Sequence, residues 1–151
     1  MMTAPVTTAR MAAPTIDAVA RCIEFAAAQA RDAGFSLARV REVELVVEEV
    51  VANICRYSYG DQPGSVEFCC RRLDGEQLAL EFIDHGRPFD MLALPAPDLS
   101  VDLDQRDIGG LGVPMLRALV DQVTYRREGA RNILCVIVHA TPRLGGDPGT
   151  T

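Results

Sequence analysis

The feature that most constrains the fold is a change of hydrophobic periodicity, from helical spacing before residue 57 to strand-like runs after residue 65. Residues 14–33 carry apolar side chains three and four positions apart and are followed by Gly34, which predicts an amphipathic helix with a glycine stop. A second helix is predicted from the capping residue Ser36 to about Tyr57. Its buried stripe is expected at Val40, Val43, Val47, Val50 and Ile54.

The second half of the chain predicts paired strands. Two β-rich runs, 65–73 and 77–83, are joined by Asp74-Gly75-Glu76, and Asp-Gly is a strong hairpin signal. A short helix is predicted at 113–120, and a second hairpin pairs 123–127 with 132–139. This order indicates an α+β fold, a two-layer α/β sandwich with the helices on one face of a mixed, mostly antiparallel sheet. We expect one domain over residues 14–140, an N-terminal segment at 1–13 and a disordered tail at 141–151.

The charged residues exclude several classes of function. The 151-residue chain has 21 acidic and 15 basic residues, a formal net charge of −6, and no cluster of positive residues that nucleic acid would need. All 15 bases are arginines. The absence of lysine excludes a P-loop lysine, the β3 lysine of ordinary protein kinases and a Schiff base. A phosphate site must therefore use backbone N–H groups, arginine or a metal ion.

The five cysteines are odd in number and show no C-x-x-C spacing, which predicts buried thiols in a reducing cytosol. The first 13 residues lack the apolar core of a signal peptide, and no apolar run approaches about 18 residues. We expect a cytoplasmic protein without a membrane span.

Three short motifs are candidates for a functional site. Glu49 and Asn53 are four residues apart on the second helix, so their side chains project only about 40° from each other. Taken alone, such a pair is more often an ordinary solvated part of a helix. Asp84 and Gly86 follow a strand, where a carboxylate can project and a glycine lets a flat ligand approach the backbone. A D-x-G sequence is also a common turn.

The third motif is Ile-Gly-Gly-Leu-Gly at 108–112, directly before the predicted helix at 113–120. Glycines at the start of a helix can expose unpaired N–H groups toward an anion. The segment 84–112 that ends here is a long loop rich in Gly, Pro and Asp, and such loops are usually functional or mobile. Hydrolase and zinc chemistry are disfavoured, because the chain has no G-x-S-x-G motif, two histidines and no cysteine pair with metal spacing.

The order and spacing of these motifs resemble the GHKL (Bergerat-fold) ATPases and, within them, the bacterial anti-sigma-factor serine/threonine protein kinases with a histidine-kinase-like ATPase domain. The resemblance covers about residues 14–140. It is carried by Asn53, by D-x-G-x-P-F-D at 84–90 and by IGGLGVPMLRALVDQVTYRR at 108–127. It implies a Bergerat ATP-binding fold, ATP and Mg²⁺ as cofactors, and transfer of phosphate to a serine or threonine of a partner.

The resemblance also implies residue roles. Asn53 would hold Mg²⁺, and Glu49 would be the general base for a substrate hydroxyl. Asp84 would accept a hydrogen bond from the exocyclic amine of adenine. The segment from about Pro95 to Gly110 would form the ATP lid, with Arg106 as its cation. The other nucleotide-binding candidates are Gly86, Pro88, Gly109, Gly110, Leu111, Gly112 and Asn132.

Two residues depart from the family pattern. Asn132 stands where many GHKL proteins place a threonine that supports adenine, and Tyr57 stands where close relatives often have a histidine. The resemblance further implies partner switching, in which a homodimer holds a sigma factor or another target and phosphorylates a STAS-domain antagonist (an anti-anti-sigma protein). Neither a nucleic acid nor a membrane is expected as a partner.

Two alternatives stay open. The chain could be a non-catalytic, nucleotide-responsive protein-binding switch, in which Glu49→Ala would leave partner control intact. A detached ATPase module of a sensor histidine kinase is disfavoured, because no dimerising helix with a phospho-accepting histidine precedes the domain. The sequence does not identify the target.

Overall fold

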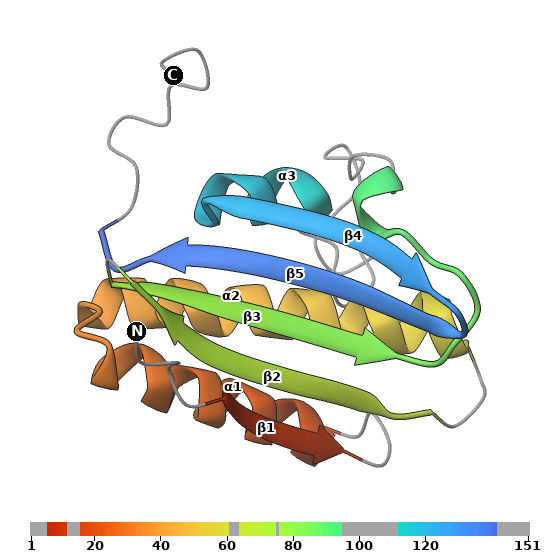
Figure 1. Ribbon diagram of the computed structural model, residues 1–151, viewed down its shortest axis with the longest axis horizontal. Helices are drawn as coiled ribbons and strands as arrows, with labels where there is room; N and C mark the ends of the chain where they lie inside the picture. Colours follow the sequence, from red (N-terminus) through yellow and green to blue (C-terminus); the bar gives the residue numbers. More distant parts are fainter. Residues whose placement is uncertain (1–5, 12–15, 61–63, 75, 95–111, 142–151) are drawn as a thin grey trace, which may run out of the picture.

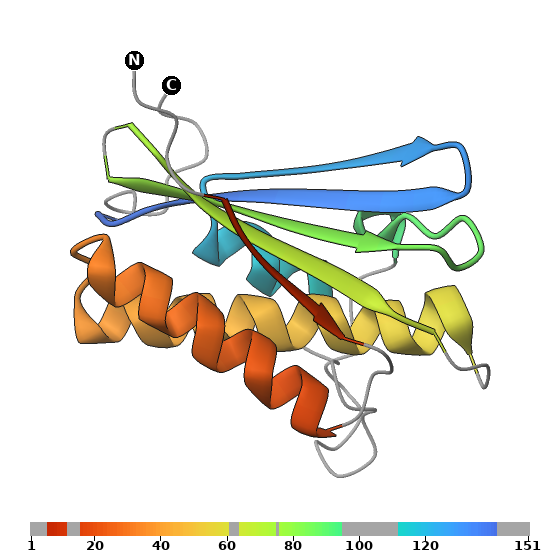
Figure 2. The same cartoon turned by 60° about the horizontal axis from the view of Figure 1, so that its bottom comes forward.

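The computed structural model describes residues 6–11, 16–60, 64–74, 76–94 and 112–141 of the chain. Three helices lie on one face of a five-stranded sheet, so the predicted two-layer α+β fold is confirmed (Figures 1 and 2). The helices are α1 (Ile16–Asp32), α2 (Leu37–Asn53) and α3 (Gly112–Leu119). The strands are β1 (Val6–Met11), β2 (Val66–Leu73), β3 (Gln77–Asp84), β4 (Gln122–Glu128) and β5 (Arg131–His139).

The strand order is β1-β2-β3-β5-β4, and the two predicted hairpins are β2–β3 and β4–β5. Every pairing among the described strands is antiparallel, so the sheet is not mixed in this part of the chain. Strand β1 was not predicted and lies in the segment assigned to residues 1–13. Its β-branched Val6, Thr7 and Thr8 favour a strand. Its partner β2 is distant in sequence, so no local pattern indicates that the two strands pair.

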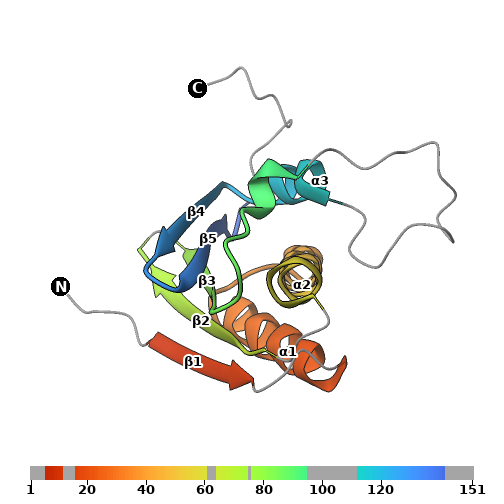
Figure 3. The same cartoon turned by 90° about the vertical axis from the view of Figure 1, so that its right-hand side faces the viewer.

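Helix α2 is the centre of the core. Its predicted stripe is confirmed, because the first four valines of that stripe are fully buried and Ile54 is nearly so. The predicted cap is also present, with Ser36 Oγ accepting a hydrogen bond from the Arg39 N–H at 3.1 Å. Val46 and Val51 on the flanks of the stripe are buried as well. Helix α2 therefore lies against the sheet with α1 and α3 beside it, which allows polar side chains on its flanks to be buried too (Figure 3).

The second helix ends earlier than predicted. Its α-helical part stops at Asn53, and the chain continues as a π-helical segment, η1 (Ile54–Tyr59). Such segments are rare and are often found at functional sites. The Tyr59 hydroxyl donates to the Ser65 carbonyl at 2.6 Å and accepts from the His85 N–H at 2.9 Å. Tyr59 thereby attaches η1 to Ser65, which precedes β2, and to His85 of the D-x-G motif, which follows β3.

At the other end of α2, the buried Arg39 guanidinium connects three elements. It donates to the backbone carbonyls of Leu119 at 2.7 Å and His139 at 2.9 Å. It also pairs with the carboxylates of Glu42 at 2.7 Å and Asp121 at 3.2 Å. These contacts hold the C-terminal end of α3 and the end of β5 against α2.

The cysteines agree only in part with the prediction of buried thiols. Cys22 and Cys70 are buried, whereas Cys55, Cys69 and Cys135 are partly exposed, and all five are free. Cys55 packs against the core, whereas Cys69 and Cys135 line a separate pocket with Arg71, Ala79 and Glu81. Among the described residues, no helix has the length and apolar character needed to span a membrane.

Candidate active site

The structure brings Glu49 and Asn53 into one hydrogen-bonded group. Asn53 Nδ2 donates to the Glu49 carbonyl at 2.8 Å and to Glu49 Oε1 at 3.2 Å. Each of the two residues is only 4% exposed, so their interpretation as solvated helix residues is wrong. The Gly112 N–H donates to the same Oε1 at 2.8 Å, which links the C-terminal part of α2 to the first residue of α3.

The environment of Glu49 favours its protonated form. Burial raises the pKa of this carboxyl group above its ordinary value. The hydrogen bonds from Gly112 and Asn53 oppose that effect by stabilising the carboxylate, and the neighbouring charge of Glu48 adds to the increase. A carboxylate with a raised pKa holds a transferred proton better than an exposed one does, which suits a general base.

Gly112 is the one residue of the glycine motif that the structure describes. Its φ of +74° lies in the left-handed region that favours glycine. Its N–H, which was predicted to face phosphate, is bonded to Glu49 here. The other predicted lid and loop residues lie outside the described part of the chain: Arg106, Gly109, Gly110, Leu111 and the rest of the lid from Pro95.

A second polar group lies where β3 ends. Asp84 is 1% exposed, and its Oδ1 accepts hydrogen bonds from the Gly86 N–H and from Asn132 Nδ2, both at 2.9 Å. Asp84 pairs with Asn132 across β3 and β5, and Asn132 pairs with Arg127 across β5 and β4. The sheet register therefore places a carboxylate, an amide and a guanidinium in one row.

The structure gives a different reason for the glycine at position 86. A Cβ atom there would lie 2.4 Å from the Ser58 carbonyl oxygen, so no side chain fits between this turn and η1. The Arg87 N–H donates to that same carbonyl at 3.0 Å. Gly86 is thus required by packing of the chain on itself, whether or not a ligand approaches. Pro88, also predicted as a site residue, is exposed after this turn.

Tyr57, which replaces the expected histidine, packs beside this turn. Its ring stacks on Phe89 with centroids 5.0 Å apart, and its backbone carbonyl accepts a hydrogen bond from Arg87 Nε at 2.6 Å. The tyrosine therefore supports the segment that follows the D-x-G motif.

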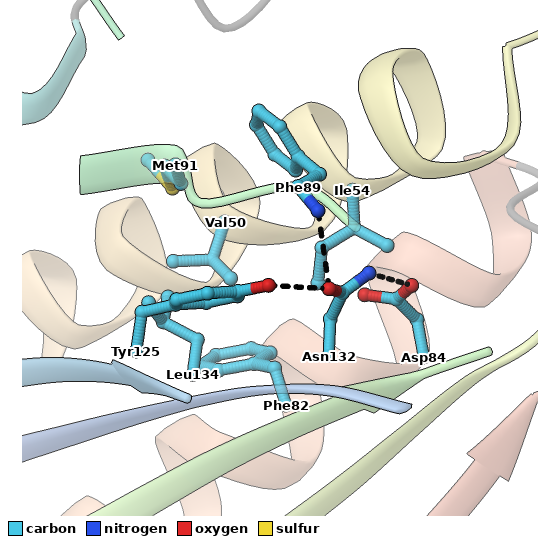
Figure 4. Close-up of a pocket in the computed structure, with 9 residues that line it drawn as sticks. All are labelled: Val50, Ile54, Phe82, Asp84, Phe89, Met91, Tyr125, Asn132 and Leu134. Atoms are coloured by element: carbon cyan, nitrogen blue, oxygen red, sulfur yellow. Dashed lines mark hydrogen bonds between the residues drawn. The ribbon is translucent and has the colours of Figure 1, made fainter. Parts of the chain in front are cut away.

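A narrow pocket opens between α2 and the sheet beside Asp84 (Figure 4). Its empty volume, including the open mouth, is about 250 Å³. Only about 10 Å³ of this space is open to a water-sized molecule, so the apolar slot must widen before a flat base can lie against the Asp84 carboxylate. Sequence reasoning missed Tyr125, although it lies on the half-buried side of β4 with Val123 and Arg127. The lining residues are Val50, Ile54, Phe82, Asp84, Phe89, Met91, Tyr125, Asn132 and Leu134.

The residues present fit a magnesium nucleotide. Because Asn53 Nδ2 is bonded to Glu49, the amide orientation is set, and no described residue donates to its Oδ1. Mg²⁺ is usually bound through one or two carboxylates together with substrate phosphates and water, so a single neutral amide oxygen would leave most of the coordination and all of the neutralising charge to the phosphates. Among the described residues, no group of three or more His, Cys, Asp or Glu side chains could hold a metal ion.

Comparison with known proteins identifies similar sequences and a similar fold. The family model described as the histidine kinase-like ATPase domain matches residues 12–138. The chain is 26% identical over 107 residues to serine/threonine-protein kinase BtrW of Bordetella bronchiseptica, covering 70% of this chain and 75% of that protein. It is 26% identical over 110 residues to serine-protein kinase RsbW of Listeria monocytogenes, covering 68% of each.

The fold is similar to a solved structure of the RsbU and RsbW domains of Rv1364c from Mycobacterium tuberculosis, with a TM-score of 0.60 and 13% identity. The match covers 89% of this chain and 33% of that one, so the chain corresponds to a third of the larger protein. At this identity, the similarity supports the fold alone.

Proposed function

The chain belongs to the histidine kinase-like ATPase domain family, and on this premise we propose that it is an ATP-dependent serine/threonine protein kinase of the anti-sigma, partner-switching kind. The observation that carries the proposal is the buried Glu49 carboxylate, held between Asn53 of α2 and the N-terminus of α3. The names of BtrW and RsbW, both protein kinases, support the same class of reaction.

Each polar group has a distinct task in this proposal. Asp84 accepts a hydrogen bond from the amine of adenine, and Asn53 Oδ1 is the protein ligand of Mg²⁺. When bound, ATP supplies the phosphoryl group, and Mg²⁺ neutralises much of the negative charge of the phosphates. Glu49 Oε1 is already bonded to Asn53 and Gly112, so Oε2 is the atom that takes the proton of the substrate hydroxyl.

The partners in this proposal follow from the sequence resemblance. The phosphorylated residue is a serine or threonine of a STAS-domain antagonist, and the protein held in the other state is a sigma factor or another target. The kinase acts as a homodimer in the cytoplasm. In this scheme, phosphorylation of the antagonist keeps the target bound, and unphosphorylated antagonist releases it.

The kinase proposal is tested with the purified chain, Mg-ATP and the STAS-domain proteins of the source organism. We expect one of these proteins to gain phosphate on serine or threonine, detected by mass spectrometry. Glu49→Gln should abolish the transfer while ATP still binds. Glu48→Gln is the matched control, because Glu48 is the adjacent carboxylate and is exposed. ATP binding without transfer to any STAS-domain protein would contradict the kinase proposal.

One observation favours the second candidate, a non-catalytic nucleotide-responsive switch. Gly112 donates its N–H to Glu49 in this structure, so a phosphate that took this N–H would change the contact between α2 and α3. Such a change could alter the surface that a partner binds without any transfer of a phosphoryl group. Under this alternative, Glu49→Gln would still release the target in response to nucleotide.

A further inference from the structure

The amide group of Asn132 on β5 is the connection between the proposed base pocket and β4. Its Nδ2 donates to Asp84 Oδ1 at 2.9 Å and to the Arg87 carbonyl at 2.8 Å. The side chain is only 3% exposed, so water does not compete freely for these bonds. Both N–H groups of the amide are therefore hydrogen-bonded, one to the Asp84 carboxylate and one to the Arg87 carbonyl.

The oxygen of the same amide accepts from three donors. The Tyr125 hydroxyl donates to Asn132 Oδ1 at 2.7 Å, and Arg127 Nη1 donates to it at 3.1 Å. The third donor is the Phe89 N–H, also at 3.1 Å (Figure 4). Arg127 Nη1 further donates to the Gly86 carbonyl at 2.9 Å, so it also fixes the turn that follows Asp84.

These donors determine which way the amide faces. A reversed amide would direct its NH₂ group at the N–H donors of Phe89 and Arg127. It would also direct its oxygen at the Asp84 carboxylate, and both contacts are repulsive. Two of the three donors to Oδ1 are side chains of β4, so that strand adds two hydrogen bonds to those that the amide makes with Phe89, Asp84 and Arg87.

The orientation of Asn132 in turn decides what Asp84 offers to a ligand. Asp84 Oδ1 already accepts two N–H bonds, and no described residue donates to Oδ2. A purine with a 6-amino group can donate to such an oxygen, whereas a 6-oxo purine would place its own oxygen against it. An amide that was held less firmly would no longer fix the Asp84 carboxylate, so Oδ2 could turn away from a 6-amino group, and the distinction would weaken.

We propose that Tyr125 and Arg127 are positioning residues that set the selectivity of this pocket for 6-amino over 6-oxo purine nucleotides by fixing the amide of Asn132. This inference rests on the proposed function, because it takes the pocket to be the nucleotide site. It adds two residues, neither of which touches the reacting phosphate, and it explains how an asparagine serves in place of the threonine expected at position 132.

The test compares the affinities for Mg-ADP and Mg-IDP by isothermal titration calorimetry of the full chain. The two bases differ in the 6-substituent and in the proton that the 6-oxo base carries on N1. Wild type should prefer ADP. Tyr125→Phe combined with Arg127→Gln should reduce the ADP/IDP affinity ratio by about tenfold, since two hydrogen bonds that hold the amide are lost. Tyr125→Phe combined with Arg127→Lys should reduce the ADP/IDP affinity ratio less than the first pair does, because lysine keeps a hydrogen-bond donor at position 127. General damage to the pocket would weaken both ligands and leave the ratio unchanged.

Arg126→Gln is the matched control, because Arg126 is the neighbouring arginine on β4 and its side chain is 51% exposed. It should leave the ratio unchanged. An unchanged ratio in the double variant, with ADP still bound, would overturn the inference and leave the proposed function standing. Failure of wild type to bind either nucleotide would overturn both.

A measurement on wild type keeps the inference testable if the double variant does not fold. Both side-chain amide protons of Asn132 are hydrogen-bonded, so their exchange with solvent, followed by NMR, should be much slower than that of exposed asparagine amides. Exchange at the rate of an exposed amide would overturn the inference.

Discussion

Replacing Gly86 with alanine should damage both stability and nucleotide binding. The added Cβ would lie 2.4 Å from the Ser58 carbonyl oxygen, whereas ordinary contact begins at 3.4 Å, so the two backbones must separate by about 1 Å. Ser58 belongs to the π-helical segment η1, and its carbonyl also accepts the Arg87 N–H. Overpacking and the weakened hydrogen bond together should lower the free energy of unfolding by about 2–3 kcal/mol.

The displacement should also reach the proposed base site, because Gly86 donates its N–H to Asp84. A misplacement of about 1 Å can weaken function by up to about a hundredfold. Urea denaturation followed by circular dichroism measures the stability, and titration with Mg-ADP measures the affinity.

Gly34→Ala is the control for this variant. Gly34 has a φ of +86° and open space around it, so alanine there strains only the backbone, by about 1–2 kcal/mol, and should leave ADP affinity unchanged. If Gly86→Ala unfolds at the wild-type urea concentration and binds ADP normally, the steric argument is refuted.

Three further predictions concern buried polar groups. Burial raises the pKa of Glu49 above 4.5, so its contribution to stability is complete below pH 4.5 and is lost as the pH rises through its folded pKa. Glu49→Gln should therefore gain stability relative to wild type as the pH rises above 4.5 in urea denaturation, and a difference that does not vary with pH would contradict this. Arg39→Met should lose about 3–5 kcal/mol in the same assay because it leaves the partly buried Asp121 carboxylate without this partner. The exposed Arg41→Met should change stability by less than about 0.5 kcal/mol, and equal losses would refute the role of burial. Burial raises the pKa of the Cys22 and Cys70 thiols to about 12, so iodoacetamide at about pH 8 should modify them only after unfolding, as judged by mass spectrometry. Modification of either thiol at the unfolded rate would disprove this.

Much of the fold was predictable because its signals are local. The valine stripe of α2, the Ser36 cap and the two hairpins each depend on residues close together in the sequence, and all are confirmed. The missed strand β1 depends on pairing with the distant β2. The change from α-helix to π-helix after Asn53 also has no clear local signal, since apolar spacing continues to Ile54.

The candidate site was predictable as a set of residues but not as an arrangement. Glu49, Asn53, Asp84 and Asn132 were identified from motif order, and the structure places them in two hydrogen-bonded groups, while their roles stay predictions. The burial of Glu49 could not be predicted from helical spacing. It depends on elements packed beside α2, and spacing alone favoured a solvated face.

The amino-acid sequence alone indicates the order of most helices and strands and the residue types available for chemistry, including a complete lack of lysine. Hydrophobic periodicity and residue type are properties of neighbouring positions, so no tertiary information is needed to read them. The hydrogen bond from Gly112 to Glu49 and the hydrogen bonds from Tyr125 and Arg127 to Asn132 form only when the chain is folded. Those contacts depend on the packing of α3 against α2 and on the register of β4 against β5. Both arise from cooperation between distant segments that no local pattern specifies.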